Sequence, residues 1–194
     1  MKPAQALSTH VALLRGINVG GKNMLPMKDL VEMFTEAGCT GVRTYIQSGN
    51  VVFDALPALV KTIPAHITNR IEELFGLRIP VILRTASEMA TASRNNPFMK
   101  TGVDEKLLYV FFLAHLPAPE NVLTLDPGRS VPDSFSVQNR EIYLHLPNGA
   151  GRTKLTNAWF DTKLATTSTA RNWRTVLTLT QMILERGTRR GTQP

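Results

Sequence analysis

The chain has 194 residues, of which 43% are hydrophobic, so it is long enough for one large domain or two small ones with a substantial core. Its 22 Lys and Arg against 15 Asp and Glu give a formal net charge of +7, which fits an anionic partner or simply a basic surface. One cysteine and four widely separated histidines offer no disulfide or metal-ligand spacing, and the longest apolar run is too short to span a bilayer.

The first half of the chain alternates short apolar strands with amphipathic helices. Apolar runs bounded by turn residues predict strands at 10–14, 42–47, 50–53 and 80–84. Apolar residues in helical register predict a helix from Pro26 to a stop at Gly38, a second over 60–74 and a short third from about 86 to 93.

The second half repeats this order after a polar linker at 95–105. Its strands are predicted at 107–113, 134–138, 141–146 and 167–171. A short helical or irregular segment near 120–125, a helix from Thr153 to about Leu164 and a last helix after Arg171 complete the pattern.

The repeated order predicts the fold class. A β-α-β-β-α-β unit of this length is the ferredoxin-like arrangement, and two copies predict an α+β fold with internal duplication and mostly antiparallel sheets. We expect the first repeat at 1–96, the second at 97–186 and a flexible basic tail at 187–194. Both faces of the strand at 107–113 are apolar, so we expect the other repeat or a partner chain to cover the second sheet face.

A glycine-rich basic loop follows the first strand. Glycine lets backbone N–H groups turn toward an anion, and the arginine and lysine of this loop add positive charge. The spacing fits a nucleotide-binding G-x-x-x-x-G-K loop, but Asn23 stands where such a loop needs Ser or Thr. We expect a different anion-binding loop, with a purely structural turn as the alternative. Its candidate ligand-binding residues are Arg15, Gly16, Asn18, Gly20, Gly21 and Lys22.

The turn of the first hairpin is predicted to lie next to this loop. In the ferredoxin-like topology the first and third strands are neighbours, so the end of one meets the start of the other. Gln47, Ser48 and Asn50 are therefore further candidate ligand-binding residues. The alternative is that Ser48-Gly49-Asn50 only makes a tight turn, because glycine and asparagine tolerate positive φ.

Two basic segments of the second half are also candidate anion sites. One surrounds Thr153, a predicted helix N-cap, where free N–H groups favour an anion. The other opens the last helix, with Asn172 as the predicted N-cap. The alternatives are an ordinary capped loop and a cap that packs on the core. The candidate ligand-binding residues of these segments are Arg152, Lys154, Arg171, Asn172 and Arg174.

Four motifs follow one another along the chain: LRGINVGGKN, TYIQSGNVVF, GRTKLTN and TARNWRT. In these motifs the chain resembles a bacterial family that is described only as a domain of unknown function. The resemblance covers nearly the whole chain and implies a two-repeat α+β fold and a bacterial cytosolic protein. It implies no activity.

The basic loops favour a cytoplasmic protein that binds a phosphorylated or other anionic small molecule, with no metal and no cofactor. The first ten residues lack the apolar core of a signal peptide. Whether the protein is an enzyme stays open, because no motif places a nucleophile beside a general base. The alternatives are a basic protein that binds RNA or DNA through phosphate contacts, and an interaction module without a small ligand.

Overall fold

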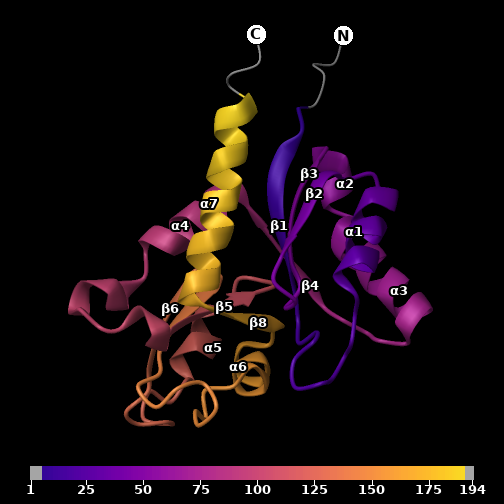
Figure 1. Cartoon of the computed structure of the whole chain (residues 1–194). Coiled ribbons are helices and arrows are strands. Elements are labelled where there is room, and N and C mark those ends of the chain that lie inside the picture. Colours follow the sequence, from indigo (N-terminus) through magenta and orange to yellow (C-terminus); the bar gives the residue numbers. More distant parts are fainter. Residues whose placement is uncertain (1–5, 191–194) are drawn as a thin grey trace. The chain divides into compact units, whose positions relative to one another are not determined.

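The computed structural model describes residues 6–190, with residues 1–5 and 191–194 outside the described part. The chain divides into two compact units, residues 1–90 with 179–194 and residues 91–178. Each unit contains one four-stranded antiparallel sheet (Figure 1). The two are called unit 1 and unit 2 below.

Unit 1 is the first ferredoxin-like repeat. Its strands lie in the order β2-β3-β1-β4, so β1 and β3 are neighbours at the centre, as the topology predicts. The elements are β1 (Ser8–Leu14), α1 (Met27–Glu36), β2 (Thr40–Tyr45), β3 (Asn50–Ala55), α2 (Pro57–Val60), α3 (Ile63–Phe75), β4 (Val81–Thr85) and α4 (Ala86–Arg94).

Unit 2 contains the second repeat, with the strand order β6-β7-β5-β8. This order is equivalent to that of the first sheet, position by position, and the duplicated α+β fold is thereby confirmed. The elements of this repeat are the 3₁₀ turns η1 (Pro97–Thr101) and η2 (Glu105–Leu107), β5 (Leu108–Leu113), α5 (Pro119–Leu123), β6 (Ser134–Gln138), β7 (Glu141–His145), α6 (Asn157–Leu164), β8 (Ser168–Asn172) and α7 (Trp173–Arg190). Residues 91–94 of α4 belong to unit 2, and residues 179–190 of α7 belong to unit 1.

The core of unit 1 lies between its sheet and the helices α1 and α3. Helix α1 follows Pro26 and buries residues three and four apart, and Gly38 turns the chain away with φ +89°. Residues of the sheet and both helices that share this core include Leu14, Phe53, Phe34, Ile67 and Ile71.

The core of unit 2 is built in the same way. Phe111 of β5 packs edge-on against Phe160 of α6, with ring centroids 5.6 Å apart. Residues on both faces of β5 are buried, as the apolar strand predicts. In each unit the central strand β1 or β5 is mostly buried.

Two buried arginines hold equivalent positions in the two sheets. Arg84 of β4 pairs with Val11, and Arg171 of β8 pairs with Val110. Both side chains are buried, and each donates through Nη1 to the carbonyl oxygen of the residue before it. The duplication thus extends from the order of the strands to single side chains.

The helix predicted to begin at Thr153 begins later. Helix α6 starts at Asn157, and its N-cap is Thr156, whose Oγ1 accepts from the Trp159 N–H at 3.2 Å. The prediction of Thr153 as N-cap was wrong because Leu155 is buried in the core, which holds residues 153–155 in a loop. The helix predicted over 60–74 is likewise divided, into α2 and α3.

The last helix is longer than expected. Helix α7 continues to Arg190, so Arg186 lies within a helix, where it pairs with Asp54 at 3.6 Å. Residues 191–194 of the predicted tail 187–194 lie outside the described residues. The flexibility of that tail stays a prediction.

The described residues form neither a membrane-spanning helix nor a cluster of metal ligands. None of the helices in that part of the chain is long and apolar enough to cross a membrane. Residues 6–190 also contain no group of three His, Cys, Asp or Glu side chains that lie close enough together for a metal ion.

Candidate ligand-binding loops and pockets

The glycine-rich loop after β1 contains a small hairpin of its own. Val19 and Lys22 form an isolated antiparallel bridge, and the Lys22 N–H donates to the Val19 carbonyl at 3.1 Å. Gly20 and Gly21 form the tip with φ +59° and +74°. Two successive positive φ values define a tight hairpin turn that favours glycine, so the turn by itself explains this glycine pair.

Asn18 joins this loop to the turn of the first hairpin. Its Nδ2 donates to the carbonyl oxygens of Leu25 and Gln47, both at 2.8 Å, and its Oδ1 accepts from the Leu25 N–H at 2.8 Å. The loop and the β2–β3 turn are therefore adjacent, as the topology predicts. Asn18 uses its whole amide group for this connection, which gives it a clear structural role.

The Ser48-Gly49-Asn50 turn is shaped by close packing. A Cβ on Gly49 would lie 2.6 Å from the Cβ of Leu14, and the residue has φ +72°. Asn50 is fully buried and donates to the Tyr45 carbonyl and to Ser48 Oγ. These contacts support the structural interpretation of the turn, while Gln47 remains exposed beside the loop.

Two pockets lie against the loop of unit 1. One, of about 340 Å³, is lined mostly by apolar residues together with two amides: Asn18, Met24, Leu25, Pro26 and Gln47. The other, of about 240 Å³, is lined by two arginines, an asparagine and backbone of the β1 and β4 ends: Arg15, Gly16, Asn23, Arg78, Ile79 and Pro80. The second pocket has the cationic lining that an anion needs.

Arg78 is a site residue that sequence reasoning missed. The Arg15 N–H donates to the Pro80 carbonyl at 3.0 Å, which brings the start of β4 to the end of β1. In the ferredoxin-like topology the fourth strand lies next to the first and runs antiparallel to it, so the residues just before the fourth strand are expected beside the end of the first. None of the four motifs includes Arg78, which lies between the second and the third of them.

The GRTKLTN segment of unit 2 is a docked loop. Ser130 Oγ accepts from the Lys154 N–H at 3.0 Å, and Arg129 Nε donates to the Lys154 carbonyl at 3.0 Å. Arg129 also lies over the Trp159 ring at 4.8 Å. The side chains of Arg152 and Lys154 are exposed, and the free helix N–H groups expected around Thr153 are absent from this described segment.

The RNW segment divides its residues between core and surface. Arg171 is 6% exposed and donates to Thr169 Oγ1 at 2.9 Å, and burial lowers the pKa of its guanidinium to about 9. Asn172 Oδ1 accepts from the Thr175 N–H at 2.8 Å, which confirms the predicted cap of α7. Arg174 is exposed, so only Asn172 and Arg174 of this segment reach the surface.

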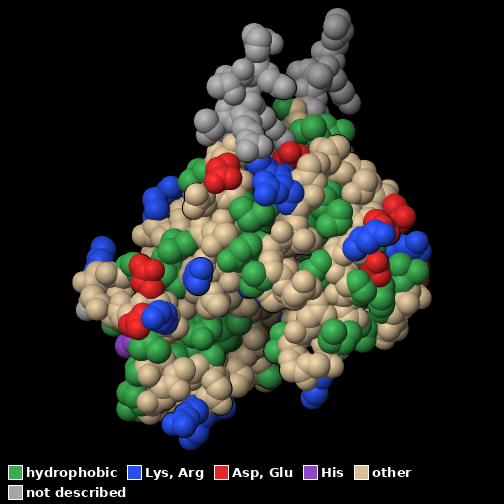
Figure 2. Space-filling model, in the orientation of Figure 1, with side chains coloured by type: hydrophobic (Ala, Val, Ile, Leu, Met, Phe, Trp, Pro, Cys, Tyr) green, Lys and Arg blue, Asp and Glu red, His purple; other side chains and the backbone are tan. Residues whose placement is uncertain are grey.

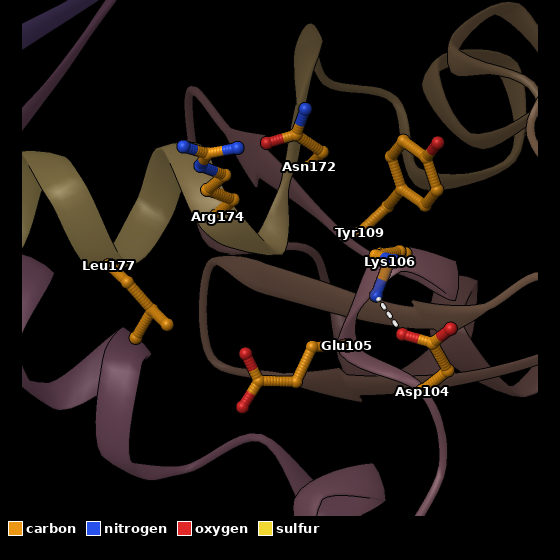
Figure 3. A pocket seen from close by; sticks show the side chains of 7 residues that line it. All are labelled: Asp104, Glu105, Lys106, Tyr109, Asn172, Arg174 and Leu177. Atoms are coloured by element: carbon orange, nitrogen blue, oxygen red, sulfur yellow. Dashed lines mark hydrogen bonds between the residues drawn. The ribbon is translucent and has the colours of Figure 1, made fainter.

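Asn172 and Arg174 line a pocket with a volume of about 670 Å³ (Figure 3). Asn172 ends β8 and Arg174 lies in the first turn of α7, and charged residues of both signs face them from the chain before β5. The other lining residues are Asp104, Glu105, Lys106, Tyr109 and Leu177. The sequence interpretation treated 95–105 as a linker and so missed this contribution.

The charges of this pocket oppose one another. Two cationic and two anionic side chains line it, and Asp104 Oδ1 accepts from the Lys106 N–H at 2.9 Å. This lining combines both signs of charge, whereas the described lining of the pocket at Arg15 and Arg78 has two cations and no carboxylate. The predicted residues are thus found in separate places, those of 15–50 in unit 1 and those of 152–174 in unit 2.

Burial shifts the pKa of two side chains of unit 1, Cys39 and His10. Burial raises the pKa of the Cys39 thiol to about 11, so it remains protonated and unreactive. Burial also lowers the pKa of His10, which stacks on Phe53 with ring centroids 5.8 Å apart. Cys39 packs in the core just before β2, and His10 packs on the sheet through Phe53.

Comparisons with known proteins agree with this architecture. The model of the family "Protein of unknown function (DUF1697)" matches residues 7–143, and the chain belongs to that family. The chain is similar in structure to a conserved bacterial protein, SP0830 from Streptococcus pneumoniae, at 20% sequence identity and a TM-score of 0.69, over 92% of this chain and 99% of that one. No curated protein matches the sequence. These likenesses establish the family and the fold.

Proposed function

We propose that this protein binds an anionic small molecule in the bacterial cytosol, at the pocket of Arg15 and Arg78. The observation that carries the proposal is the lining of that pocket, where two arginines from the ends of neighbouring strands meet Asn23 and the backbone at Gly16. A phosphate or carboxylate group suits this lining because the guanidinium fork matches two oxygens of either anion.

The loop is held in shape before a ligand arrives. Asn23 Nδ2 donates to the Gly16 carbonyl at 2.9 Å, and the Asn18 N–H donates to the Asn23 carbonyl at 3.2 Å. A loop with internal bonds of this kind loses little conformational freedom when it binds, which favours affinity. Lys22 at the hairpin tip adds positive charge to the approach of the ligand.

Arg78 has a carboxylate partner that a ligand would replace. Its Nη1 lies 3.6 Å from Glu72 Oε2, and the arginine side chain is 79% exposed. An exposed ion pair of this kind contributes about 1 kcal/mol or less, so a better placed anion displaces it at little cost.

The test is a titration with inorganic phosphate at low ionic strength, with the affinity measured by isothermal titration calorimetry. Arg15→Gln and Arg78→Gln should each weaken binding about tenfold, because each removes a charge-assisted hydrogen bond. Arg43→Gln is the matched control, since Arg43 is an exposed arginine of unit 1 on β2. Unchanged affinity in both test variants would contradict the proposal.

Salt dependence separates this proposal from nucleic-acid binding. Figure 2 shows the lysine and arginine side chains of one face as separate groups, with aspartate and glutamate among them. Binding along a nucleic-acid backbone releases many counterions and weakens steeply with salt, whereas one anion at two arginines has a shallow dependence. Tight RNA or DNA binding at physiological salt would favour the nucleic-acid alternative instead.

A further inference from the structure

A second cationic pocket lies in unit 2, where α4 ends and η1 begins. Its volume is about 280 Å³, and it shares no residue with the pocket of Figure 3 or with the site at Arg15. It is lined by two cations, three amide side chains and a proline: Arg94, Asn95, Asn96, Pro97, Lys100 and Gln138.

Asn96 is the unusual member of this lining. The residue is only 2% exposed, and its Oδ1 accepts from the Phe98 N–H at 3.1 Å. Its Nδ2 is buried and has no hydrogen-bond partner among the described residues. A buried donor without a partner is unfavourable, and native proteins contain few of them.

The orientation of this amide is determined by its neighbours. Asn96 is the N-cap of η1, and Pro97 at the first position of the turn restricts the backbone there. Since Oδ1 is held by the Phe98 N–H, the amide nitrogen is the atom that Asn96 has left for a ligand. What the pocket lacks is therefore a hydrogen-bond acceptor.

The charge of the lining defines that acceptor. Arg94 and Lys100 are cationic and exposed, and no carboxylate is among the described residues that line the pocket. Two exposed cations by themselves are weak determinants, but a cationic pocket around a buried donor selects an oxygen that carries negative charge. Asn95 and Gln138 add amide groups that suit a polar ligand body.

We infer that this pocket binds a small polar molecule through an oxyanion group, a phosphate or a carboxylate. One oxygen of the group accepts from Asn96 Nδ2, and Arg94 and Lys100 neutralise its charge. This site is separate from the one proposed at Arg15 and Arg78, and it gives unit 2 a ligand of its own.

The experiment is a nuclear magnetic resonance titration of the full chain with inorganic phosphate and, in a second arm, with acetate. We expect the side-chain amide signals of Asn96 to shift and saturate with the anion that fits. Saturation with phosphate alone assigns a phosphate group, and saturation with acetate alone assigns a carboxylate. An Asn96 signal that neither anion moves would overturn the inference.

Asn96→Asp is the decisive variant. It keeps an oxygen to accept from the Phe98 N–H but replaces the donor with a negative charge, so binding at this pocket should weaken more than tenfold. Asn148→Asp is the matched control, because it makes the same change of charge at an exposed loop residue of unit 2. Equal affinity in the two variants would contradict the role of Asn96.

A double variant tests the inference independently if Asn96→Asp fails to fold. Arg94→Gln with Lys100→Gln changes only exposed side chains, and this double variant should also weaken the Asn96 response about tenfold or more. Arg15→Gln should leave the response unchanged, which separates this site from the proposed function. A full response in the double variant would overturn the inference.

Discussion

The two repeats differ most in the segment that follows their first strand. In unit 1, twelve residues, 15–26, separate β1 from α1 and contain the small hairpin, both loop pockets and the asparagines that hold the loop. In unit 2, the five residues 114–118 join β5 directly to the short helix α5. A connection can be as short as the one in unit 2, and the longer one of unit 1 contains the pocket of the proposed function.

The frame around these loops is the same in both repeats. The Leu14 N–H donates to the Gly49 carbonyl, and the Leu113 N–H donates to the Arg140 carbonyl, both at 2.8 Å. These equivalent bonds connect each central strand to its hairpin turn. The two repeats therefore share their sheet order and the bonds between strand and turn, and they differ in the loops and in the residues of the turns. The following substitutions test that conclusion.

The largest difference is expected at the two equivalent turn positions, Gly49 and Arg140. Gly49→Ala should destabilise the protein by about 2–4 kcal/mol, because its Cβ would overlap Leu14 and its φ is positive. Arg140→Ala should cost about 1 kcal/mol, from the loss of the bond to the Ala114 carbonyl. Urea unfolding followed by circular dichroism measures both, and similar losses would show that the turns are not specialised.

The second difference concerns the loops themselves. Asn18→Ala removes three hydrogen bonds that hold the long loop and should cost about 2–3 kcal/mol. His115→Ala at the exposed start of the short connection should change stability by less than about 0.5 kcal/mol. Urea unfolding gives both values, and a neutral Asn18→Ala would mean that the loop has no fixed conformation.

Equal effects are expected where the repeats agree, at the caps of the helices that follow β4 and β8. Thr85 Oγ1 accepts from the Glu88 N–H, and Asn172 Oδ1 accepts from the Thr175 N–H. Thr85→Ala and Asn172→Ala should each cost about 1 kcal/mol. Thermal unfolding of the two variants tests this, with Thr162→Ala on the exposed face of α6 as control. Clearly unequal losses of stability would mean that the two caps do not contribute equally, although their hydrogen bonds are equivalent.

The smallest effect is the pH dependence that His10 of β1 contributes, at the position where the second repeat has Tyr109. Burial lowers the pKa of His10 below its ordinary value of 6.5, so the unfolded chain takes up a proton before the folded one does. Stability should therefore fall as the pH drops through that unfolded value. His10→Gln should reduce this loss when thermal unfolding is compared at about pH 7.5 and about pH 5.5. An unchanged pH dependence would contradict the prediction.

Local patterns were sufficient for the fold. Strand and helix positions follow from apolar periodicity and turn residues, and the repeated order predicts both sheets and the adjacency of 15–22 to 47–50. The helix start at Thr153 was wrong for a local reason as well. Thr153 and Thr156 are both threonines before an apolar stretch, and only the burial of Leu155 separates them.

The sequence by itself determined the duplicated α+β fold, the central strands and the place of the long loop, because each depends on neighbours along the chain. The tertiary structure alone decided that Arg78 joins Arg15, that Arg171 is buried, and that the Asn96 amide nitrogen lacks a partner. These facts depend on which distant residues the sheet order brings together and which polar atoms the packing leaves without a hydrogen-bond partner.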